Sequence, residues 1–371
     1  MTNQSSSSSS LSPILCASFN QDYSGFSIGT KDGFKIFDSD SGRLCYDRAM
    51  GAFNIVEMMF GSSLLAIVGA GEQPSLSPRR LCLFNTKTGA AARELNFLTS
   101  ILAVRLNMKR LIVLLQDKTY IYDLNSLAIL ETIDTVPNPK GLCAFSPNLE
   151  GCYLAVPAST IKGSVLLYNV MELQSHCEIE AHRSPLAAIA LSSNGLYIAT
   201  ASEQGTIIRV HLVTLATKSY SFRRGTYPSA IYSLSFGPPM QLPDILVATS
   251  SSGSVHVFSL AFMIKQRSKR SSSLLGSMIP NKINDAFEPM HHYVLPNAVP
   301  AGVKSYVMIR GRGADTVAVM SPKSQTIISQ ALITIITFNG YLQQYKFSID
   351  HAHVSWSLER ELNLLTAGFT V

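Results

Sequence analysis

The stretch YIATASEQGTIIRVH, at residues 197–211, decides the fold. It begins with apolar and β-branched residues, turns in a polar segment that contains Gly205, and continues as a second apolar run that ends in His211. Runs of this length on either side of a glycine turn are typical of strands. The stretch therefore predicts two consecutive strands of one sheet.

The same unit recurs along the chain. Six other copies lie at residues 26–38, 79–85, 118–123, 163–169, 245–259 and 332–346. Between the last residues of successive units, five intervals lie in the range 38 to 48 residues and the sixth is 87. A four-stranded propeller blade takes roughly 40 to 45 residues. We therefore predict an all-β protein, a WD40-like seven-bladed β-propeller, with about forty additional residues in the sixth blade.

The ends and the insertion complete this prediction. Residues 1–12 contain the serine run from Ser5 to Ser10 and are expected to be disordered. Residues 13–371 are expected to form the propeller, with the strand at 14–19 pairing into the last blade to close the ring. The strand pattern fails at about residues 263–304, which we assign to a long loop of blade six. An open sandwich, the alternative fold, explains neither the period nor the count.

Composition narrows the range of functions. Of the 371 residues, 46% are hydrophobic and 15% are charged, and the net charge of +6 favours an anionic partner, either membrane or nucleic acid. The six cysteines are far apart and follow no secretory signal, so we expect the reducing cytosol. No apolar run approaches the roughly 18 residues of a spanning helix, so any membrane contact is expected to be peripheral.

Enzyme motifs are missing from the sequence. We find no nucleotide-binding glycine motif, no His-Glu-x-x-His zinc motif, no nucleophile elbow and no paired cysteines. The adjacent His291 and His292 fall in the predicted loop, and isolated histidines are more often surface or packing residues than ligands. We therefore expect no catalytic residue, no metal and no cofactor.

Two adjacent arginines, Arg223 and Arg224, stand in the stretch KSYSFRRG, which reads as a strand ended by Gly225. Successive side chains of a strand point to opposite faces, so each arginine would face a different cleft, one toward its own blade and one toward the next. The planar guanidinium suits phosphate. The pair therefore predicts two neighbouring anion sites. The alternative is two solvated arginines on the surface of a basic protein.

Several longer stretches resemble those of one family. They are FNQDYSGFSIGTKDGFKIF from Phe19, NIVEMMFGSSLLAIVG from Asn54, GEQPSLSPRRL from Gly71, AHRSPLAAIALSSNGLYIATASEQGTIIRV from Ala181, and then FRRG and IYSLSFG. Over nearly its whole length the chain resembles the PROPPIN family, the β-propeller phosphoinositide binders that include the WIPI proteins. The stretch GEQPSLSPRRL most resembles the branch of autophagy-related protein eighteen.

The resemblance implies two lipid pockets around the motif Phe222, Arg223, Arg224 and Gly225. The first would comprise His182, Ser202, Thr206, Arg209 and Arg223, and the second Arg224, Ser250, Ser254 and His256. Where relatives often have Asp-Lys in the turn of the second pocket, this chain has Ser251 and Ser252. We therefore expect the second site to be the weaker one. The ligands implied are PtdIns3P and PtdIns(3,5)P2.

The function implied by the resemblance is that of an effector or scaffold in autophagosome formation. Such a protein is cytoplasmic and binds peripherally to preautophagosomal, endosomal or vacuolar membranes. The resemblance also implies that Pro78 and Arg79 engage a lipid-transfer partner, autophagy-related protein two. The turn that contains them is longer than closing a hairpin requires.

The predicted loop carries an apolar stripe. Leu275, Ile279, Ile283 and Phe287 recur every four residues, after a basic run that contains Lys265 and Arg270. Pro280 interrupts the pattern, so two short helical pieces are expected. We expect them to insert into the headgroup layer of a membrane. A disordered or partner-binding loop is the alternative.

Two other functions remain open. One is a protein-interaction WD-repeat scaffold without lipid binding, in which the arginines are structural, because a propeller fold alone does not decide function. The other is nucleic-acid binding, which ranks lower because aromatic and basic residues do not interleave near the arginines.

Overall fold

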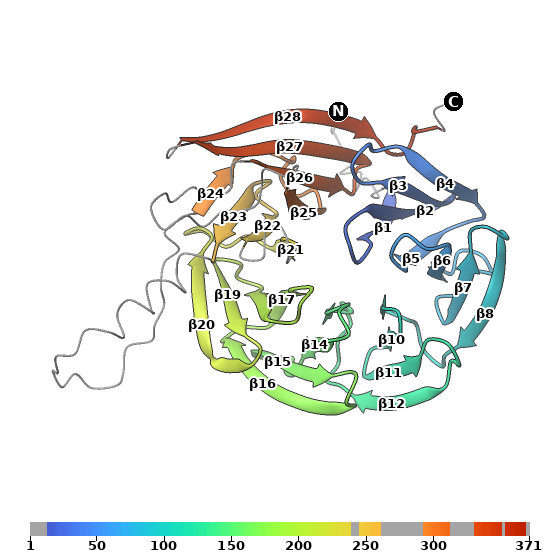
Figure 1. The fold of residues 1–371 in the computed structure, drawn as a ribbon. Helices are drawn as coiled ribbons and strands as arrows, with labels where there is room; N and C mark the ends of the chain where they lie inside the picture. Colours follow the sequence, from blue (N-terminus) through green and yellow to red (C-terminus); the bar gives the residue numbers. More distant parts are fainter. Residues whose placement is uncertain (1–12, 239–244, 261–291, 312–329, 351–352, 369–371) are drawn as a thin grey trace, which may run out of the picture.

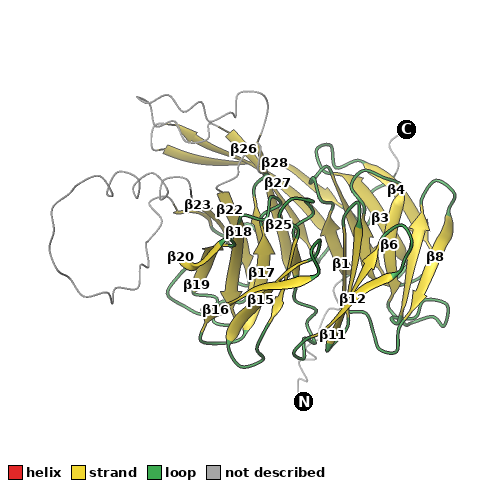
Figure 2. Ribbon diagram, turned by 60° about the horizontal axis from the view of Figure 1, so that its bottom comes forward, coloured by secondary structure: helices red, strands yellow, loops and turns green. Residues whose placement is uncertain are grey.

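The protein is a ring of seven β-sheets (Figure 1). The computed structural model describes residues 13–238, 245–260, 292–311, 330–350 and 353–368. Within these ranges the regular elements are strands joined by loops, and no helix is present (Figure 2). The predicted all-β, seven-bladed propeller is therefore confirmed.

The sheets are numbered here in chain order, and each has four strands. Sheet 1 contains β1 (Ile14–Phe19), β2 (Gly25–Thr30), β3 (Gly33–Asp38) and β4 (Leu44–Ala49). Sheet 2 contains β5 (Phe53–Met58), β6 (Leu64–Gly69), β7 (Arg80–Asn85) and β8 (Ala90–Asn96). Sheet 3 contains β9 (Ala103–Leu106), β10 (Arg110–Leu114), β11 (Lys118–Asp123) and β12 (Ile129–Asp134). Sheet 4 contains β13 (Ala144–Phe145), β14 (Tyr153–Pro157), β15 (Gly163–Asn169) and β16 (Gln174–His182).

The remaining three sheets complete the ring. Sheet 5 contains β17 (Leu186–Leu191), β18 (Tyr197–Ser202), β19 (Ile207–Leu212) and β20 (Leu215–Arg223). Sheet 6 contains β21 (Ile231–Phe236), β22 (Ile245–Ser250), β23 (Val255–Ser259) and β24 (His292–Leu295). Sheet 7 contains β25 (Ser305–Gly311), β26 (Gln330–Thr337), β27 (Tyr341–Asp350) and β28 (His353–Asn363). In every sheet the strands lie in chain order, with the first nearest the axis and the fourth at the rim (Figure 1).

The seven units found in the sequence correspond to the seven sheets. Each unit ends with the third strand of its sheet, which is β3, β7, β11, β15, β19, β23 or β27. In the deciding stretch, β18 and β19 pair antiparallel from Tyr197 opposite Leu212 to Ala201 opposite Ile208. The periodicity of the sequence is therefore the periodicity of the ring.

The hydrophobic core lies between the sheets. The described residues contain seven buried clusters, and each joins one sheet to the next around the ring. Between sheets 5 and 6, for example, Phe222 stacks on Phe258 with ring centroids 5.3 Å apart. Both faces of every sheet are thus covered by a neighbour, as apolar strands require.

The predicted closure of the ring by the N-terminal strand is wrong. β1 pairs with β2 in sheet 1, and the outer position of sheet 7 is filled by β28. Sheets 1 and 7 are joined instead by packing of Ile14, Phe26 and Ile336 in one buried cluster. A backbone hydrogen bond from Ile14 N to Phe338 O, 3.3 Å long, spans the same junction. Strand exchange is unnecessary because β28 already gives sheet 7 four strands.

The predicted loop at 263–304 also ends too late. Residues 292–295 are β24, which pairs with β23 from Val255 opposite Leu295 to Phe258 opposite His292. Residues 261–291 lie outside the described part of the chain. β24 was missed because a four-residue strand with two polar or aromatic residues gives little periodic signal.

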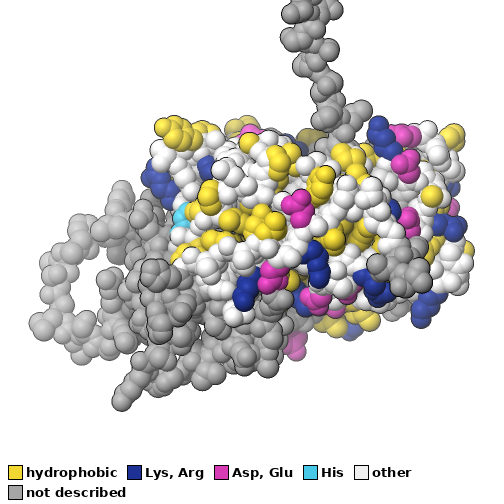
Figure 3. All heavy atoms as spheres, turned by 90° about the horizontal axis from the view of Figure 1, so that it is seen from above, with side chains coloured by type: hydrophobic (Ala, Val, Ile, Leu, Met, Phe, Trp, Pro, Cys, Tyr) yellow, Lys and Arg dark blue, Asp and Glu magenta, His cyan; other side chains and the backbone are white. Residues whose placement is uncertain are grey.

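Charged side chains lie among hydrophobic ones along the rim at sheet 7. Figure 3 views the ring from the side of β28 and shows small hydrophobic areas separated by basic and acidic groups. On this strand Leu358 is 50% exposed, whereas Trp356 packs on Phe347 with ring centroids 4.6 Å apart. The outer strand pairs with β27 from Tyr341 opposite Asn363 to Asp350 opposite His353, and the aromatic pair packs along this ladder.

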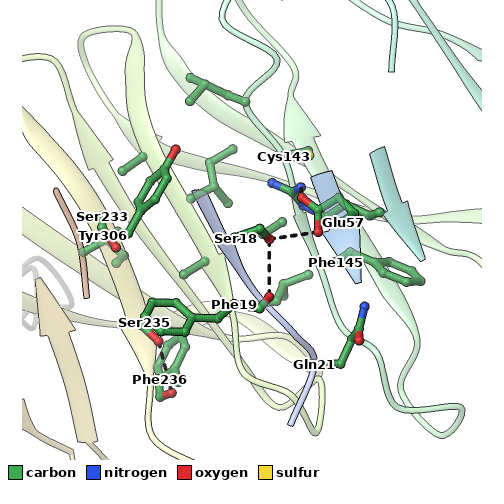
Figure 4. Close-up of a pocket in the computed structure, with 18 of the residues that line it drawn as sticks. Ser18, Phe19, Gln21, Glu57, Cys143, Phe145, Ser233, Ser235, Phe236 and Tyr306 are labelled. Atoms are coloured by element: carbon green, nitrogen blue, oxygen red, sulfur yellow. Dashed lines mark hydrogen bonds and ion pairs between the residues drawn. The ribbon is translucent and has the colours of Figure 1, made fainter. Parts of the chain in front are cut away.

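A cavity of about 360 Å³ lies near the axis, lined by first strands of several sheets (Figure 4). Ser18 Oγ donates to a Glu57 carboxylate oxygen at 2.9 Å, and Arg105 contacts the other oxygen at 2.5 Å. Burial raises the pKa of the Glu57 carboxyl, and the charge of Arg105 opposes that rise. These three residues come from β1, β5 and β9, so one polar chain joins sheets 1, 2 and 3.

The Glu57–Arg105 contact predicts a measurable contribution to stability. In Arg105→Met the carboxyl stays buried without its cation, so the free energy of unfolding should fall by roughly 2 kcal/mol at pH 7.5. The unpaired carboxyl would have a higher pKa in the folded chain than in the unfolded chain, so the loss should grow as the pH rises from 5 to 8. Urea denaturation at several pH values measures both effects.

The matched control is Glu57→Gln combined with Arg105→Met. It buries no charge, so it should recover part of the loss and show little of the added pH dependence. A double variant no more stable than Arg105→Met at pH 7.5 would show that the ion pair is not what joins the sheets.

Candidate functional site

The paired arginines lie at the end of β20, the outer strand of sheet 5. β16, β20 and β24, the outer strands of sheets 4, 5 and 6, follow one another around the rim (Figure 1). Phe222 is fully buried opposite Ile208, on the face of sheet 5 that packs against sheet 6. Arg223, opposite Ile207, therefore lies on the other face, toward sheet 4.

Arg224 follows the strand and turns the opposite way. Its backbone N–H donates to Thr206 O at 2.8 Å, and its Nε donates to Gly205 O at 2.6 Å. Its guanidinium also donates to the carbonyl of Tyr227. Burial lowers the pKa of Arg224, and its charge contributes to the lowered pKa values of His256 and His292 in sheet 6. Arg224 therefore lies on the side of sheet 6, whereas Arg223 lies on the side of sheet 4.

On the side of sheet 5 that faces sheet 4, Arg209 contacts His182 at the end of β16. The Arg209 guanidinium donates to Ala181 O at 2.5 Å and to His182 Nδ1 at 3.1 Å. Arginine can only donate, so Nδ1 of His182 is the acceptor of this bond. The proton of the neutral ring is therefore on Nε2, which donates to Thr200 Oγ1 at 3.0 Å. Burial, followed by the charge of Arg209, lowers the pKa of His182 to about 4.

Two other residues predicted for the first site lie at the turn from β18 to β19. Ser202 is buried at the end of β18, and Thr206 is half-buried in the turn before β19. Two neighbours were not predicted. Thr200 accepts the hydrogen bond of the His182 ring. Burial lowers the pKa of Arg209, and the charge of the nearby, exposed Arg183 lowers it further. Arg183 directly follows His182, which is the signal that could have identified it.

On the side toward sheet 6, two histidines of that sheet contact each other. His256 Nδ1 and His292 Nε2 are 2.9 Å apart, and the His292 ring stacks on Phe258 with centroids 4.5 Å apart. Burial, then the charges of His292 and Arg224, lower the pKa of His256 to about 3. The buried Nε2 of His256 has no hydrogen-bond partner among the described residues. The expectation that His292 lies in a loop is therefore wrong.

The serines between β22 and β23 make hydrogen bonds that stabilise the turn there. Ser250 Oγ lies 2.9 Å from Ser252 Oγ, and Ser251 Oγ accepts from Ala230 N at 3.0 Å. Ser254 is half-buried at the start of β23. This turn thus carries neutral hydroxyls, and Ser251 bonds to the connection between sheets 5 and 6.

Gly205 lies in the turn from β18 to β19. Its φ is +61°, and a Cβ at this position would lie 1.7 Å from the carbonyl oxygen of Ser229. Only glycine allows the turn to approach the connection so closely. The same residue accepts the hydrogen bond from Arg224 Nε. The turn therefore fixes the position of the Arg224 side chain.

The turn at residues 71–79 of sheet 2 is held by backbone hydrogen bonds. Pro78 O accepts from Ile101 N at 2.8 Å, and Arg79 O accepts from Phe97 N at 2.9 Å. The Arg79 side chain is exposed, and nearby Leu98 is 92% exposed. By contrast, Arg105 and Arg110 of sheet 3 form ion pairs with Glu57 and Asp123.

Other predicted features lie outside the described residues. These are Leu275, Ile279, Ile283 and Phe287 of the apolar stripe, and the serine-rich residues 1–12. In the part of the chain that is described, no helix has the length and apolar character to cross a membrane. Over the same residues no group of three or more histidine, cysteine, aspartate or glutamate side chains has the arrangement of a metal site.

Comparison with known proteins identifies a family. A family model described as PROPPIN matches residues 13–293. The chain is 68% identical over 356 residues to autophagy-related protein 18b of Arabidopsis thaliana, covering 96% of this chain and 97% of that protein. It is 35% identical over 392 residues to autophagy-related protein 18 of Yarrowia lipolytica, covering 91% and 93%.

Solved structures show the same fold. Kluyveromyces lactis Hsv2 matches with a TM-score of 0.70 and 17% identity, covering 95% of this chain and 99% of that one. KlAtg21, solved in complex with the coiled-coil of AgAtg16, matches with a TM-score of 0.71 and 23% identity, over the same shares of the two chains. At these identities the likeness concerns the fold alone.

The buried histidines predict how stability depends on pH. Burial lowers the pKa of His182 and His211 to about 4 and that of His256 to about 3, from 6.5. Below pH 6.5 the unfolded chain therefore binds more protons than the folded chain, and stability falls as the pH falls toward these values. We expect Tm to fall by on the order of 5 °C between pH 7 and pH 5, measured by scanning calorimetry.

His211→Gln is the matched variant, because it removes one of these groups and leaves the others. Its Tm should depend less steeply on pH in the same window. A wild-type Tm that stays constant from pH 7 to pH 5 would contradict the assignment of neutral buried histidines.

Proposed function

We propose, since the chain belongs to the PROPPIN family, that it is a phosphoinositide-binding peripheral membrane protein. Its ligands are PtdIns3P and PtdIns(3,5)P2, and it acts as an effector or scaffold in autophagosome formation. The observation that carries this proposal is that Arg223 and Arg224 face opposite sides of sheet 5. Arg223 is on the side where Arg209 contacts the buried His182, and Arg224 is on the side of the buried His256. In this proposal the protein is cytoplasmic and binds to preautophagosomal, endosomal or vacuolar membranes.

The first proposed lipid pocket lies at the outer junction of sheets 4 and 5. Arg209 is already held by Ala181 O and His182, so it offers a fixed guanidinium with donors left over. Arg223 is exposed and can move onto a phosphate, while the hydroxyls of Ser202 and Thr206 lie at the turn. Guanidinium groups and hydroxyls on neighbouring elements suit a doubly charged phosphate group.

The second proposed lipid pocket lies at the outer junction of sheets 5 and 6. The buried Nε2 of His256 has no hydrogen-bond partner among the described residues, and such an unpaired atom destabilises the fold. A hydrogen bond to a bound headgroup would remove this penalty. Arg224 supplies the nearby charge. Ser251 and Ser252 add no cation, and their hydroxyls are partly used within the turn. We therefore propose that this pocket binds phosphoinositide more weakly than the first.

Two further elements complete the proposal. The apolar stripe of Leu275, Ile279, Ile283 and Phe287, which lies outside the described part of the chain, would insert into the headgroup layer. Pro78 and Arg79 in sheet 2 would dock the lipid-transfer partner, autophagy-related protein two. Leu98, exposed beside them, supports a protein contact there, because a fully exposed apolar side chain gains most from burial. A scaffold that binds proteins without lipid remains the second candidate, supported by this same surface.

Replacing both arginines tests the lipid sites. Arg223→Thr combined with Arg224→Thr should lower co-flotation with PtdIns3P vesicles by at least ~100-fold, because two charge-assisted contacts are lost. Each single variant should retain part of the binding. Arg223→Thr should leave Tm unchanged, whereas Arg224→Thr should lower it by about 2 °C because Gly205 O and Tyr227 O lose their donor.

The control removes the same charge elsewhere. Arg43 and Arg48 are exposed in sheet 1, and replacing both with threonine should leave flotation near the wild-type level. Undiminished flotation of the Arg223 and Arg224 double variant would leave the protein-only scaffold as the better description. If both double variants lost flotation to the same extent, the net charge of the protein, and not the two proposed pockets, would account for vesicle binding.

Variants of the sheet 2 turn test the partner surface. Pro78→Ala combined with Arg79→Thr keeps both backbone carbonyls that accept from Ile101 and Phe97, so the fold should be unaffected. Flotation should stay intact, while co-precipitation of autophagy-related protein two should be lost and autophagic flux should fall. Partner capture at the wild-type level would show that the docking surface lies elsewhere on the ring.

A further inference from the structure

Three large hydrophobic side chains of the described residues are more than three-quarters exposed. They are Leu98 at 92%, Tyr227 at 82% and Ile161 at 78%. Leu98 lies beside the sheet 2 turn discussed above. The other two lie beside the two proposed lipid pockets, one beside each, although they come from different connections of the ring.

Tyr227 lies in the connection from β20 to β21, next to the second pocket. The Arg224 guanidinium binds its carbonyl, so its backbone is held while its ring faces solvent. The connection is held at its other end by Ser229, whose N–H donates to Gln204 O at 3.1 Å and whose Oγ is 2.9 Å from Ser251 Oγ. The tyrosine is therefore presented from a constrained loop.

Ile161 lies in the turn from β14 to β15, next to the first pocket. Ser159 Oγ accepts from the N–H groups of Ile161 and Lys162 at 3.2 and 3.0 Å. Gly163 is paired with His182, and a Cβ at Gly163 would lie 2.5 Å from the His182 Cβ. The turn thus packs directly against the pocket histidine and presents Ile161 outward.

The chemistry around the two side chains favours a lipid surface over a protein. The exposed cations Arg183 and Arg223, and Lys162 next to Ile161, would attract anionic headgroups. Separate apolar side chains on different loops do not make the continuous patch that the core of a protein interface requires. Tyrosine in particular favours the boundary between headgroups and acyl chains.

We infer that Ile161 and Tyr227 are interfacial anchors, which enter the membrane boundary on either side of the arginines when the two pockets hold headgroups. The inference rests on the proposed function. Each pocket alone fixes one point of the rim on the membrane, and the anchors add apolar contact at two more points. They contribute to partition onto a bilayer and not to recognition of the headgroup.

The first experiment separates these two contributions. Ile161→Ser and Tyr227→Ser should each weaken partition onto PtdIns3P vesicles by roughly fivefold, and the double variant by roughly twentyfold. Calorimetric titration with the soluble headgroup inositol 1,3-bisphosphate should give the wild-type affinity for all three. The matched control is Ile129→Ser, which alters a 56% exposed isoleucine at the start of β12 in sheet 3 and should leave partition unchanged.

The second experiment reports insertion directly. The sequence has one tryptophan, Trp356, so Trp356→Phe combined with Tyr227→Trp places the single indole beside the second pocket. Its emission should shift to the blue on addition of PtdIns3P vesicles and should be quenched by brominated acyl chains. Phenylalanine at 356 keeps an aromatic ring against Phe347.

The outcomes distinguish this inference from the function on which it rests. If wild-type protein fails to bind PtdIns3P vesicles, both are overturned. If the protein binds but the serine variants partition normally, or the indole emission stays unshifted on bound vesicles, only the anchors are overturned. Weaker binding of the soluble headgroup by the serine variants would place these residues in the pockets and would also overturn their role as anchors.

Discussion

The sheets of this protein have two apolar faces, and a face without a cover would leave many hydrophobic side chains in water. A ring is a solution in which every sheet covers the next, and the seven buried clusters between neighbouring sheets show that each face is used. The polar positions follow from this constraint. Side chains that cannot enter a cluster lie near the axis, as Glu57 and Arg105 do, or at the rim, where the proposed lipid pockets lie between outer strands.

Phe222 connects the packing of the sheets to the position of the paired arginines. Its burial between sheets 5 and 6 fixes which face of β20 is apolar, so the next side chain must point the other way. Arg223 then faces sheet 4, and Arg224, after the strand, bends back to the turn at Gly205. A one-residue shift of β20 would bury an arginine and expose the phenylalanine. The core therefore holds two cations of one dipeptide apart, a geometry that their mutual repulsion also favours.

Features that depend on local repetition could be predicted from the sequence. Features that are determined by contacts between distant segments could not. The seven units were recognisable because each third strand ends in the same way, and the arginines because strand alternation is a local rule. Counting third strands does not show whether β1 belongs to the first or the last sheet, and the packing of Ile14 with Ile336 decides that. β24 has four residues, so His292 was assigned to a loop. The roles of Thr200 and Arg183 arise only when β16 and β18 meet.

The seam between sheets 1 and 7 has a topological consequence. Each sheet is built from one continuous segment, and the seam is held by side chains and the Ile14 to Phe338 hydrogen bond. It therefore differs from the other junctions chiefly because no loop connects its two sheets along the chain. The order of sheets around the ring is then independent of where the polypeptide starts, and a circular permutant that links β28 to β1 and opens another connection encodes the same ring. The connection between sheets 5 and 6 is the exception, because cutting it would release the backbone that holds Arg224 in place.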